Sequence, residues 1–198
     1  MKRKKKLFLI LVMFLLITSS VKIVESKNGN VMVTAFAASA SISPPETKAQ
    51  LQETISVANT LKNYFENKNH PGFLPVALAI ENSCRSHDLP FETVLAIAIL
   101  ESGYSTSEIA KQKQNFFSIG AYDKAPFEYA TDFSTLPLEQ AIDEQLLILK
   151  KDYFDKYQNN LDEISKVYCR NSDFWLEEIK IIRDDIIKHK QEEVLKWK

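Results

Sequence analysis

Apolar residues recur at spacings of three and four along most of the chain after residue 45, and this pattern predicts a helical domain. The first apolar stripe runs over residues 46–66. The segment 115–133 lacks the helical period and contains Gly120 and Pro126, so we expect an irregular loop or a small β-hairpin there. Further helices are expected over residues 75–86, 90–101, 105–113, 136–153, 160–167 and 173–190.

The helix predicted over residues 90–101 differs from the others because its centre, residues 94–100, is apolar on every side. A helix without a polar face must be surrounded by protein, so we expect it to be the core helix. It should end at Gly103, because glycine readily takes the left-handed conformation that terminates helices. The irregular segment follows directly, and this is where a cleft is expected.

Residues 1–40 carry the pattern of an export signal rather than of a folded domain. Five consecutive basic residues begin at Lys2, and an apolar run of eleven follows over residues 7–17, too short for a comfortable membrane span. Small residues at 35–40 suit signal peptidase, while cleavage nearer Ser20 and a retained membrane anchor are the alternatives. Residues 41–45 then form a linker, and the folded domain extends over residues 46–198.

The export-signal region and the remainder of the chain differ in net charge, and this difference limits the kinds of molecule that the folded domain can bind. Residues 1–40 hold seven lysines and arginines and one acidic residue, which leaves 18 basic and 25 acidic residues in the remainder. The net charge of that remainder is therefore about −7. A domain this acidic is poorly suited to nucleic acid or to an anionic membrane surface, whereas a neutral target such as a sugar polymer suits it better.

Cysteine and histidine give little sign of catalytic or metal chemistry. Cys84 and Cys169 are either two small buried side chains or, after export, the partners of a disulfide. Cys84 and His87 are three residues apart, but Cys84 lies late in an apolar helix, which is unfavourable for a reactive thiolate. The histidines at positions 70, 87 and 189 show no metal-ligand spacing, so we expect no metal and no cofactor.

Glu101 is the candidate for acid chemistry, because it lies at the end of the most apolar helix. Burial disfavours the charged form of a carboxyl group and raises its pKa. The partial negative charge at the C-terminal end of a helix acts in the same direction. A carboxyl group that keeps its proton near neutral pH is what acid-catalysed cleavage of a glycosidic bond requires.

Three motifs in order resemble those of bacterial glucosaminidases, glycoside hydrolase family 73, within the lysozyme superfamily. The first is Glu-Ser-Gly-Tyr at 101–104 followed by Thr-Ser-Glu-Ile-Ala-Lys at 106–111. The second, at 115–123, reads Asn-Phe-Phe-Ser-Ile-Gly-Ala-Tyr-Asp, and the third, at 168–175, reads Tyr-Cys-Arg-Asn-Ser-Asp-Phe-Trp. The resemblance covers about residues 75–187. It implies a mainly α, lysozyme-like domain with a small irregular or β-hairpin lobe after the catalytic helix.

The resemblance also implies roles for individual residues. Ser105 and Ser118 stand where the family usually has glycine; we expect Ser105 to be harmless as a helix cap, whereas glycine at 118 would allow a left-handed backbone. Sugar rings stack on aromatic side chains, and we expect Phe116 and Phe117 to divide, one facing the core and one the cleft. The implied catalytic residues are Glu101 as general acid, Asp123 and Tyr168, and the implied substrate-binding residues are Tyr104, Asn115, Phe116, Phe117 and Tyr122.

The second catalytic group is left open by the sequence. Glycosidases normally use two carboxyl groups, and Asp123, Glu128 and Asp132 all lie in the cleft segment. The 2-acetamido group of the substrate is a further alternative. The function implied is hydrolysis of peptidoglycan strands at N-acetylglucosaminyl bonds, outside the cell or at the cell wall. The alternatives are a lytic transglycosylase acting on the same glycan and a non-catalytic wall-binding protein of the same fold.

Overall fold

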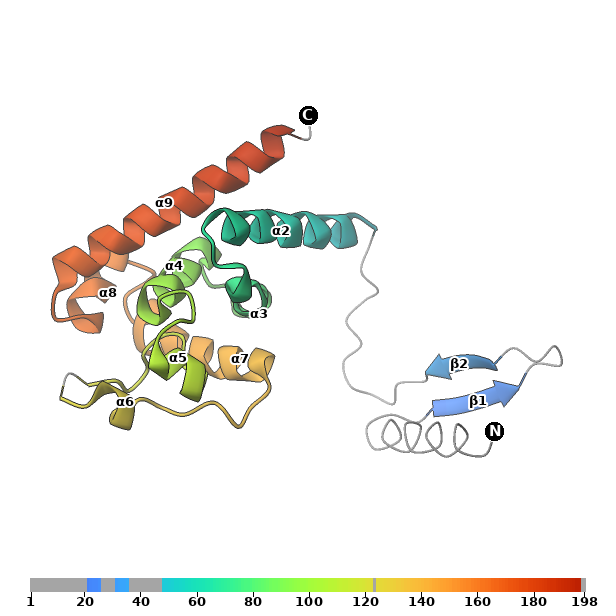
Figure 1. Cartoon of the computed structure of the whole chain (residues 1–198), viewed down its shortest axis with the longest axis horizontal. Coiled ribbons are helices and arrows are strands. Elements are labelled where there is room, and N and C mark those ends of the chain that lie inside the picture. The colour runs from blue at the N-terminus through green and yellow to red at the C-terminus, as the bar shows by residue number, and fades with distance from the viewer. Residues whose placement is uncertain (1–20, 26–30, 36–47, 123, 197–198) are drawn as a thin grey trace. The chain divides into compact units, whose positions relative to one another are not determined.

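The computed structural model describes residues 21–25, 31–35, 48–122 and 124–196. The chain divides into two units, Met1–Gln52 and Glu53–Lys198, each of which is described by itself. In the first unit, β1 (Val21–Glu25) and β2 (Val31–Ala35) form an antiparallel pair rich in β-branched residues (Figure 1). The sequence analysis assigns this segment to an export signal, and that assignment stays a prediction. The predicted basic and apolar parts of that signal, its cleavage sites and the linker at 41–45 lie outside the described residues.

Helices account for the predicted pattern in the rest of the chain (Figure 1). The mainly helical, lysozyme-like fold class is thereby confirmed. None of the described helices is both long enough and apolar enough to cross a bilayer. In chain order the elements are α2 (Lys48–Asn67), the short 3-10 turn η1 (Pro71–Phe73), α3 (Leu74–His87), α4 (Phe91–Ser102), α5 (Glu108–Lys113), α6 (Pro126–Tyr129), α7 (Leu138–Leu149), α8 (Leu161–Tyr168) and α9 (Ser172–Lys196).

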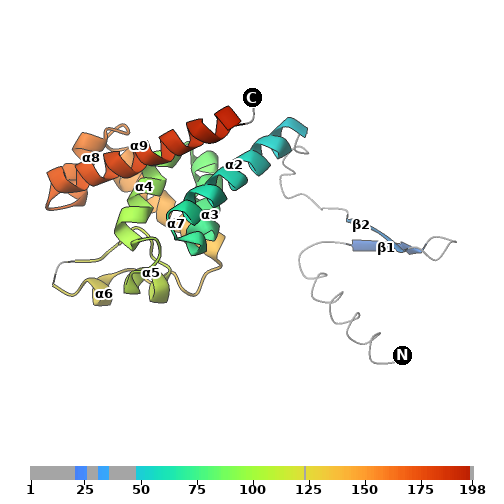
Figure 2. The same cartoon turned by 45° about the horizontal axis from the view of Figure 1, so that its top comes forward.

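The helix α4 is the core helix, as its uniformly apolar sequence predicts. Each residue from 94 to 99 is at most 2% exposed. The helices α3 and α9 pack against α4, and α9 runs along one side of it in both views (Figures 1 and 2). Because protein surrounds α4, a carboxylate in its last turn is held in a partly dry environment.

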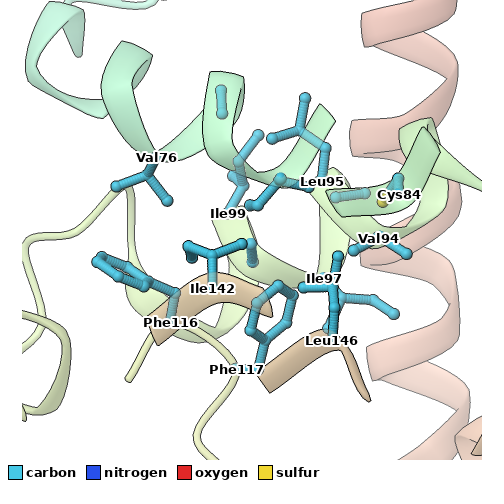
Figure 3. Close-up of a cluster of buried hydrophobic side chains, with 14 of the residues drawn as sticks. Val76, Cys84, Val94, Leu95, Ile97, Ile99, Phe116, Phe117, Ile142 and Leu146 are labelled. Carbon is cyan, nitrogen blue, oxygen red and sulfur yellow. The ribbon is translucent and has the colours of Figure 1, made fainter. Parts of the chain in front are cut away.

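Side chains from α4 and α7 meet in the hydrophobic core (Figure 3). Leu95, Ile97 and Ile99 of α4 and Ile142 and Leu146 of α7 are all at most 2% exposed. Burial of each such side chain is worth about 1.5–3 kcal/mol relative to exposure. The cluster therefore fixes α4 relative to the helix that follows the cleft segment.

The segment between α5 and α7 is irregular apart from the single turn α6. Its described residues form no strand, so the prediction of an irregular loop is confirmed and that of a β-hairpin is wrong. Thr131 N–H donates to the Ile119 carbonyl at 2.9 Å and closes the segment into a loop. Gly120 has a φ of 75°, and a Cβ there would lie 3.1 Å from the Tyr129 carbonyl oxygen, so this position requires glycine.

The helical segment reaches residue 153 as predicted, but after α7 it continues as a π turn, η2 (Lys150–Phe154). Asp155 N–H donates to the carbonyl of Lys150, five residues back, at 2.8 Å. Leu149 and Phe154 are both about 1% exposed. Residues five apart in an α-helix point roughly 140° away from each other, so the wider turn is what lets both side chains enter the core.

Candidate active site

Glu101 lies in the last turn of α4, two residues before Gly103 caps the helix with a left-handed backbone. Its partly buried carboxylate accepts a hydrogen bond of 2.8 Å from the indole Nε1 of Trp175, in the first turn of α9. The hydroxyl of Ser118 donates a second one. Burial raises the pKa of Glu101 above its ordinary value, and these two donors oppose that rise without cancelling it. The predicted desolvation of this carboxyl group is therefore confirmed.

Three aromatic rings lie beside Glu101. Trp175 and Tyr168 are stacked, with ring centroids 4.8 Å apart and an angle of 27° between their planes, and the ring of Tyr153 is tilted against Tyr168 at a centroid distance of 4.9 Å. The Tyr168 hydroxyl donates to the Phe117 carbonyl at 2.7 Å, which fixes the ring against the cleft segment. Burial raises the pKa of Tyr168 well above its ordinary value, and the negative charge of Glu101 adds to the rise. The sequence indicated Tyr168 as a site residue, whereas Trp175, the last residue of the third motif, was given no role at the site.

Ser118 occupies the position at which glycine was expected. Its φ is 52°, so the backbone here is left-handed, as the preference for glycine suggests. A non-glycine residue in this conformation costs roughly 1–2 kcal/mol. The hydroxyl donated to Glu101 offsets part of that cost, because hydrogen bonds to charged groups are stronger than neutral ones.

The turn after α4 corrects the expectation for Ser105. Gly103, Tyr104 and Ser105 have consecutive positive φ values of 54°, 56° and 65°. The cap of α5 is Ser107, whose hydroxyl accepts from Ala110 N–H at 3.2 Å. The prediction that Ser105 is a helix cap is therefore wrong: Ser105 has a left-handed backbone and a buried hydroxyl without a hydrogen-bond partner.

Asn115 fixes the cleft segment from within. It is 1% exposed, and its amide donates to the carbonyls of Ile119 at 2.9 Å and Thr131 at 3.0 Å, while its Oδ1 accepts from Ile119 N–H at 2.9 Å. Gln145 of α7, which the sequence analysis did not single out, accepts from Phe116 N–H and donates to the Gln114 carbonyl, both at 2.8 Å. These amides hold the loop in shape, so Asn115 acts on the cleft through the backbone.

Phe116 and Phe117 both belong to the hydrophobic core. Their exposed fractions are 4% and 1%, and Figure 3 shows both rings among the side chains of α4 and α7. The prediction that one ring would face the cleft is therefore wrong. The reason is that the backbone of this segment is anchored to α7 by Gln145, which directs both rings inward. Phe117 still reaches the cleft wall, where its carbonyl accepts from Tyr168.

A cleft of about 810 Å³ opens beside Glu101. The loop 117–122 forms one wall, the end of α7 with its π turn another, and residues 167, 168 and 170 a third. Ser118, the partner of Glu101, is one of the lining residues and connects the Glu101 carboxylate to the cleft. The lining residues also include four tyrosines, Tyr122, Tyr129, Tyr153 and Tyr168, and three charged side chains, Lys124, Asp152 and Arg170.

The structure brings some predicted site residues to the cleft and not others. Tyr122 lines it, is 67% exposed, and forms an edge-to-face pair with Tyr129 at 5.9 Å. Tyr104 does not line the cleft, and its ring stacks on that of His70 at a centroid distance of 4.0 Å. Asp123 lies outside the described residues.

The two other carboxylates proposed for the loop, Glu128 and Asp132, are exposed and do not line the cleft. The Asp132 carboxylate accepts from Ser134 N–H at 2.9 Å and so caps its own turn.

The thiols are not part of this site. Both cysteines are free, and burial raises the pKa of Cys84 far above the physiological range. His87 pairs with Asp143 at 2.7 Å, and Ser83 donates to the same carboxylate oxygen. These bonds join α3 to α7, where the two helices pack. Within the described residues, no group of three or more histidine, cysteine or acidic side chains is arranged to hold a metal ion.

Comparison with known proteins agrees with the motifs. The Glucosaminidase family, described as mannosyl-glycoprotein endo-beta-N-acetylglucosaminidase, matches residues 77–182, which is more than half of the chain. The match begins in α3 and ends in α9, so it contains Glu101, the whole cleft segment and Trp175. No curated protein matches the chain closely enough to count as a relative.

Proposed function

The chain belongs to the Glucosaminidase family, and on this premise we propose that it hydrolyses peptidoglycan strands at N-acetylglucosaminyl bonds, with Glu101 as the proton donor. Family membership by itself supports a glycosidase in general terms. The choice of glycan, the bond cleaved and the role of Glu101 are the proposal.

The observation that carries the proposal is the environment of Glu101. Its pKa is raised by burial, so the carboxyl group retains a proton at pH values where an exposed glutamate is ionised. Trp175 and Ser118 orient the group and stabilise the carboxylate that remains after proton transfer. Protonation of the glycosidic oxygen by Glu101 would make the sugar a better leaving group as the bond to the anomeric carbon breaks.

The cleft suits a sugar polymer. Its four tyrosines offer aromatic faces on which the apolar faces of sugar rings can stack. Tyr122 and Tyr129 are more than 60% exposed, so substrate can reach them without displacing a core side chain. The net negative charge of residues 41–198 disfavours nucleic acid as the polymer.

Analysis of the fragments released from purified peptidoglycan tests the proposal. We expect wild type to release fragments with reducing N-acetylglucosamine ends and Glu101→Gln to release fewer by at least about 100-fold. Glu177→Gln, an exposed glutamate of α9 away from the cleft, is the matched control and should retain wild-type activity.

Other outcomes of the same digest identify the alternatives. Anhydro-muramic ends would replace the hydrolase by a lytic transglycosylase, in which the 6-hydroxyl of the substrate takes the place of water. Binding of the wall without release of any fragment would indicate a non-catalytic wall-binding protein. Equal release by wild type and Glu101→Gln would contradict the role of Glu101.

We further propose that the enzyme works outside the cell or at the wall, since residues 1–40 carry the pattern of an export signal. Determining the N-terminal residue of the protein recovered from the culture medium and from the membrane fraction tests this. A new N-terminus near residue 20 or 41 supports export with cleavage, and an intact Met1 in the membrane fraction supports a retained anchor. Recovery from the cytoplasm alone would contradict the proposal.

A further inference from the structure

The cleft contains one carboxylate that the sequence motifs do not include. Asp152 belongs to the π turn η2, lines the cleft and is exposed to solvent. Among the described residues, it is the only acidic side chain in the lining. Glu128 and Asp132 do not line the cleft, and the Asp132 carboxylate is engaged by its own turn.

The π turn explains why Asp152 faces the cleft. Leu149 and Phe154 are both buried in the core, and the extra residue that the wide turn accommodates lies between them. Asp152 and Tyr153 are thereby presented to the cleft together with Ile148, one turn earlier. Single π turns inside helices are frequent at functional sites, because they redirect side chains without ending the helix.

Tyr153 relates the new carboxylate to Glu101. Burial raises the pKa of Tyr153, and the negative charges of Asp152 and Glu101 both contribute to the rise. One hydroxyl is therefore within electrostatic range of both carboxylates. Asp152 and Tyr153 are neighbours in η2 and both line the cleft, whereas Glu101 lies in the last turn of α4.

We propose that Asp152 is the second catalytic carboxylate, which accepts a proton from the water that attacks the substrate. This inference rests on the proposed hydrolysis. As the bond between the anomeric carbon and the leaving oxygen breaks, that oxygen takes the proton of Glu101. The water oxygen forms the new bond to the anomeric carbon, and its proton passes to Asp152. Exchange with solvent then returns a proton to Glu101 and removes one from Asp152.

This assignment has a stereochemical consequence. A single displacement by activated water inverts the configuration of the anomeric carbon. Assistance by the substrate's own acetamido group instead proceeds through two displacements, which retain it. The two routes therefore differ in the anomeric configuration of the first-formed product, and only the first route needs Asp152.

The test compares peptidoglycan digestion by wild type, Asp152→Asn and Asp152→Ala, with and without sodium azide. Both variants should lose turnover by about 100-fold to 10,000-fold while KM stays near the wild-type value. Azide attacks the anomeric carbon without needing a base, so it should restore turnover to Asp152→Ala and give a glycosyl azide of inverted configuration. Asp155→Asn, at the end of the same turn but outside the cleft lining, should keep wild-type turnover.

Three results would overturn the role of Asp152: full turnover in Asp152→Ala, a loss of turnover that azide does not restore, or a product that retains its configuration. The role of Asp152 would also be overturned if Asp123→Asn lost turnover that azide restored and Asp152→Asn did not. Wild type measured in the same digest separates these results from failure of the proposed function. If wild type releases no reducing N-acetylglucosamine ends, the hydrolase assignment fails, and the role of Asp152 fails with it.

Discussion

Replacement of Trp175 by phenylalanine tests whether the hydrogen bond from α9 controls the ionisation of Glu101. The indole Nε1 donates to the Glu101 carboxylate at 2.8 Å, and the ring is 3% exposed. Phenylalanine keeps an aromatic ring beside Tyr168 but has no donor. The substitution therefore removes one of the two hydrogen bonds that stabilise the charged form of Glu101.

The expected size of the effect follows from the charge on the acceptor. A hydrogen bond to a charged group is worth about 1.5–3 kcal/mol, and one between neutral groups about 0.5–1.5 kcal/mol. We expect Trp175→Phe to lower the free energy of unfolding at pH 8, where Glu101 is more ionised, by about 1 kcal/mol more than at pH 4. The smaller ring adds a cost that does not depend on pH, so the difference between the two pH values isolates the hydrogen bond.

Kinetics give the second measurement. Loss of the Trp175 donor disfavours the ionised form and therefore raises the pKa of Glu101. A general acid must be protonated to act, so the alkaline limb of kcat/KM should move to higher pH in Trp175→Phe. Tyr64→Phe is the control, because it removes a hydroxyl bonded to the Asp185 carboxylate at 2.9 Å, outside the cleft lining. An alkaline limb that stays in place, or moves to lower pH, would refute the proposed action of Trp175 on Glu101.

Three further predictions concern the same site. In urea unfolding at pH 8, Glu101→Gln should be more stable than wild type, because burial raises the pKa of Glu101 and only wild type loses stability as the pH rises through that raised pKa. The pH-dependent difference in stability between the two proteins should disappear below about pH 4. In the same assay, Ser118→Gly should be more stable than Ser118→Ala by about 1 kcal/mol, because only glycine adopts the left-handed backbone without strain, and equal stabilities would contradict that strain. Both variants should move the alkaline limb of kcat/KM to higher pH. Asn115→Ala should cost about 3 kcal/mol, since it removes three buried hydrogen bonds and takes away the partner of the Ile119 N–H and of the Thr131 carbonyl. A loss under about 1 kcal/mol would show that the loop does not depend on this amide.

The helices and the acid could be predicted because their causes are local. The all-apolar sequence around Ile97 requires burial, and Gly103 fixes where α4 ends, so the environment of Glu101 follows from neighbouring residues. The mainly helical fold and the raised pKa of Glu101 were predictable on that basis.

The partners of Glu101 could not be predicted in the same way, because they depend on tertiary packing. Trp175 lies 74 residues away, and apolar periodicity records that it is buried but not that its Nε1 donates to a carboxylate. The π turn is similar. Nothing in the pattern over 138–154 distinguishes a continuous α-helix from one with an extra residue, and that extra residue decides whether Asp152 faces the cleft. Phe116 and Phe117 were misjudged for the same reason, since Gln145 of another helix sets their direction.

The position of Trp175 on α9 also bears on the order in which the enzyme is assembled. Glu101 lies in the middle of the chain, but Trp175, which donates to its carboxylate, belongs to α9, the helix that follows α8. Contacts between residues so far apart close late, because the loop between them must first be ordered. A chain that has folded α2 to α7 without docking α9 would lack this donor and would leave α4 uncovered on the side that α9 packs against. The pKa of Glu101 therefore reaches its final value only when α9 docks, so the pKa of this carboxyl group in a partly folded chain would differ from that in the folded enzyme.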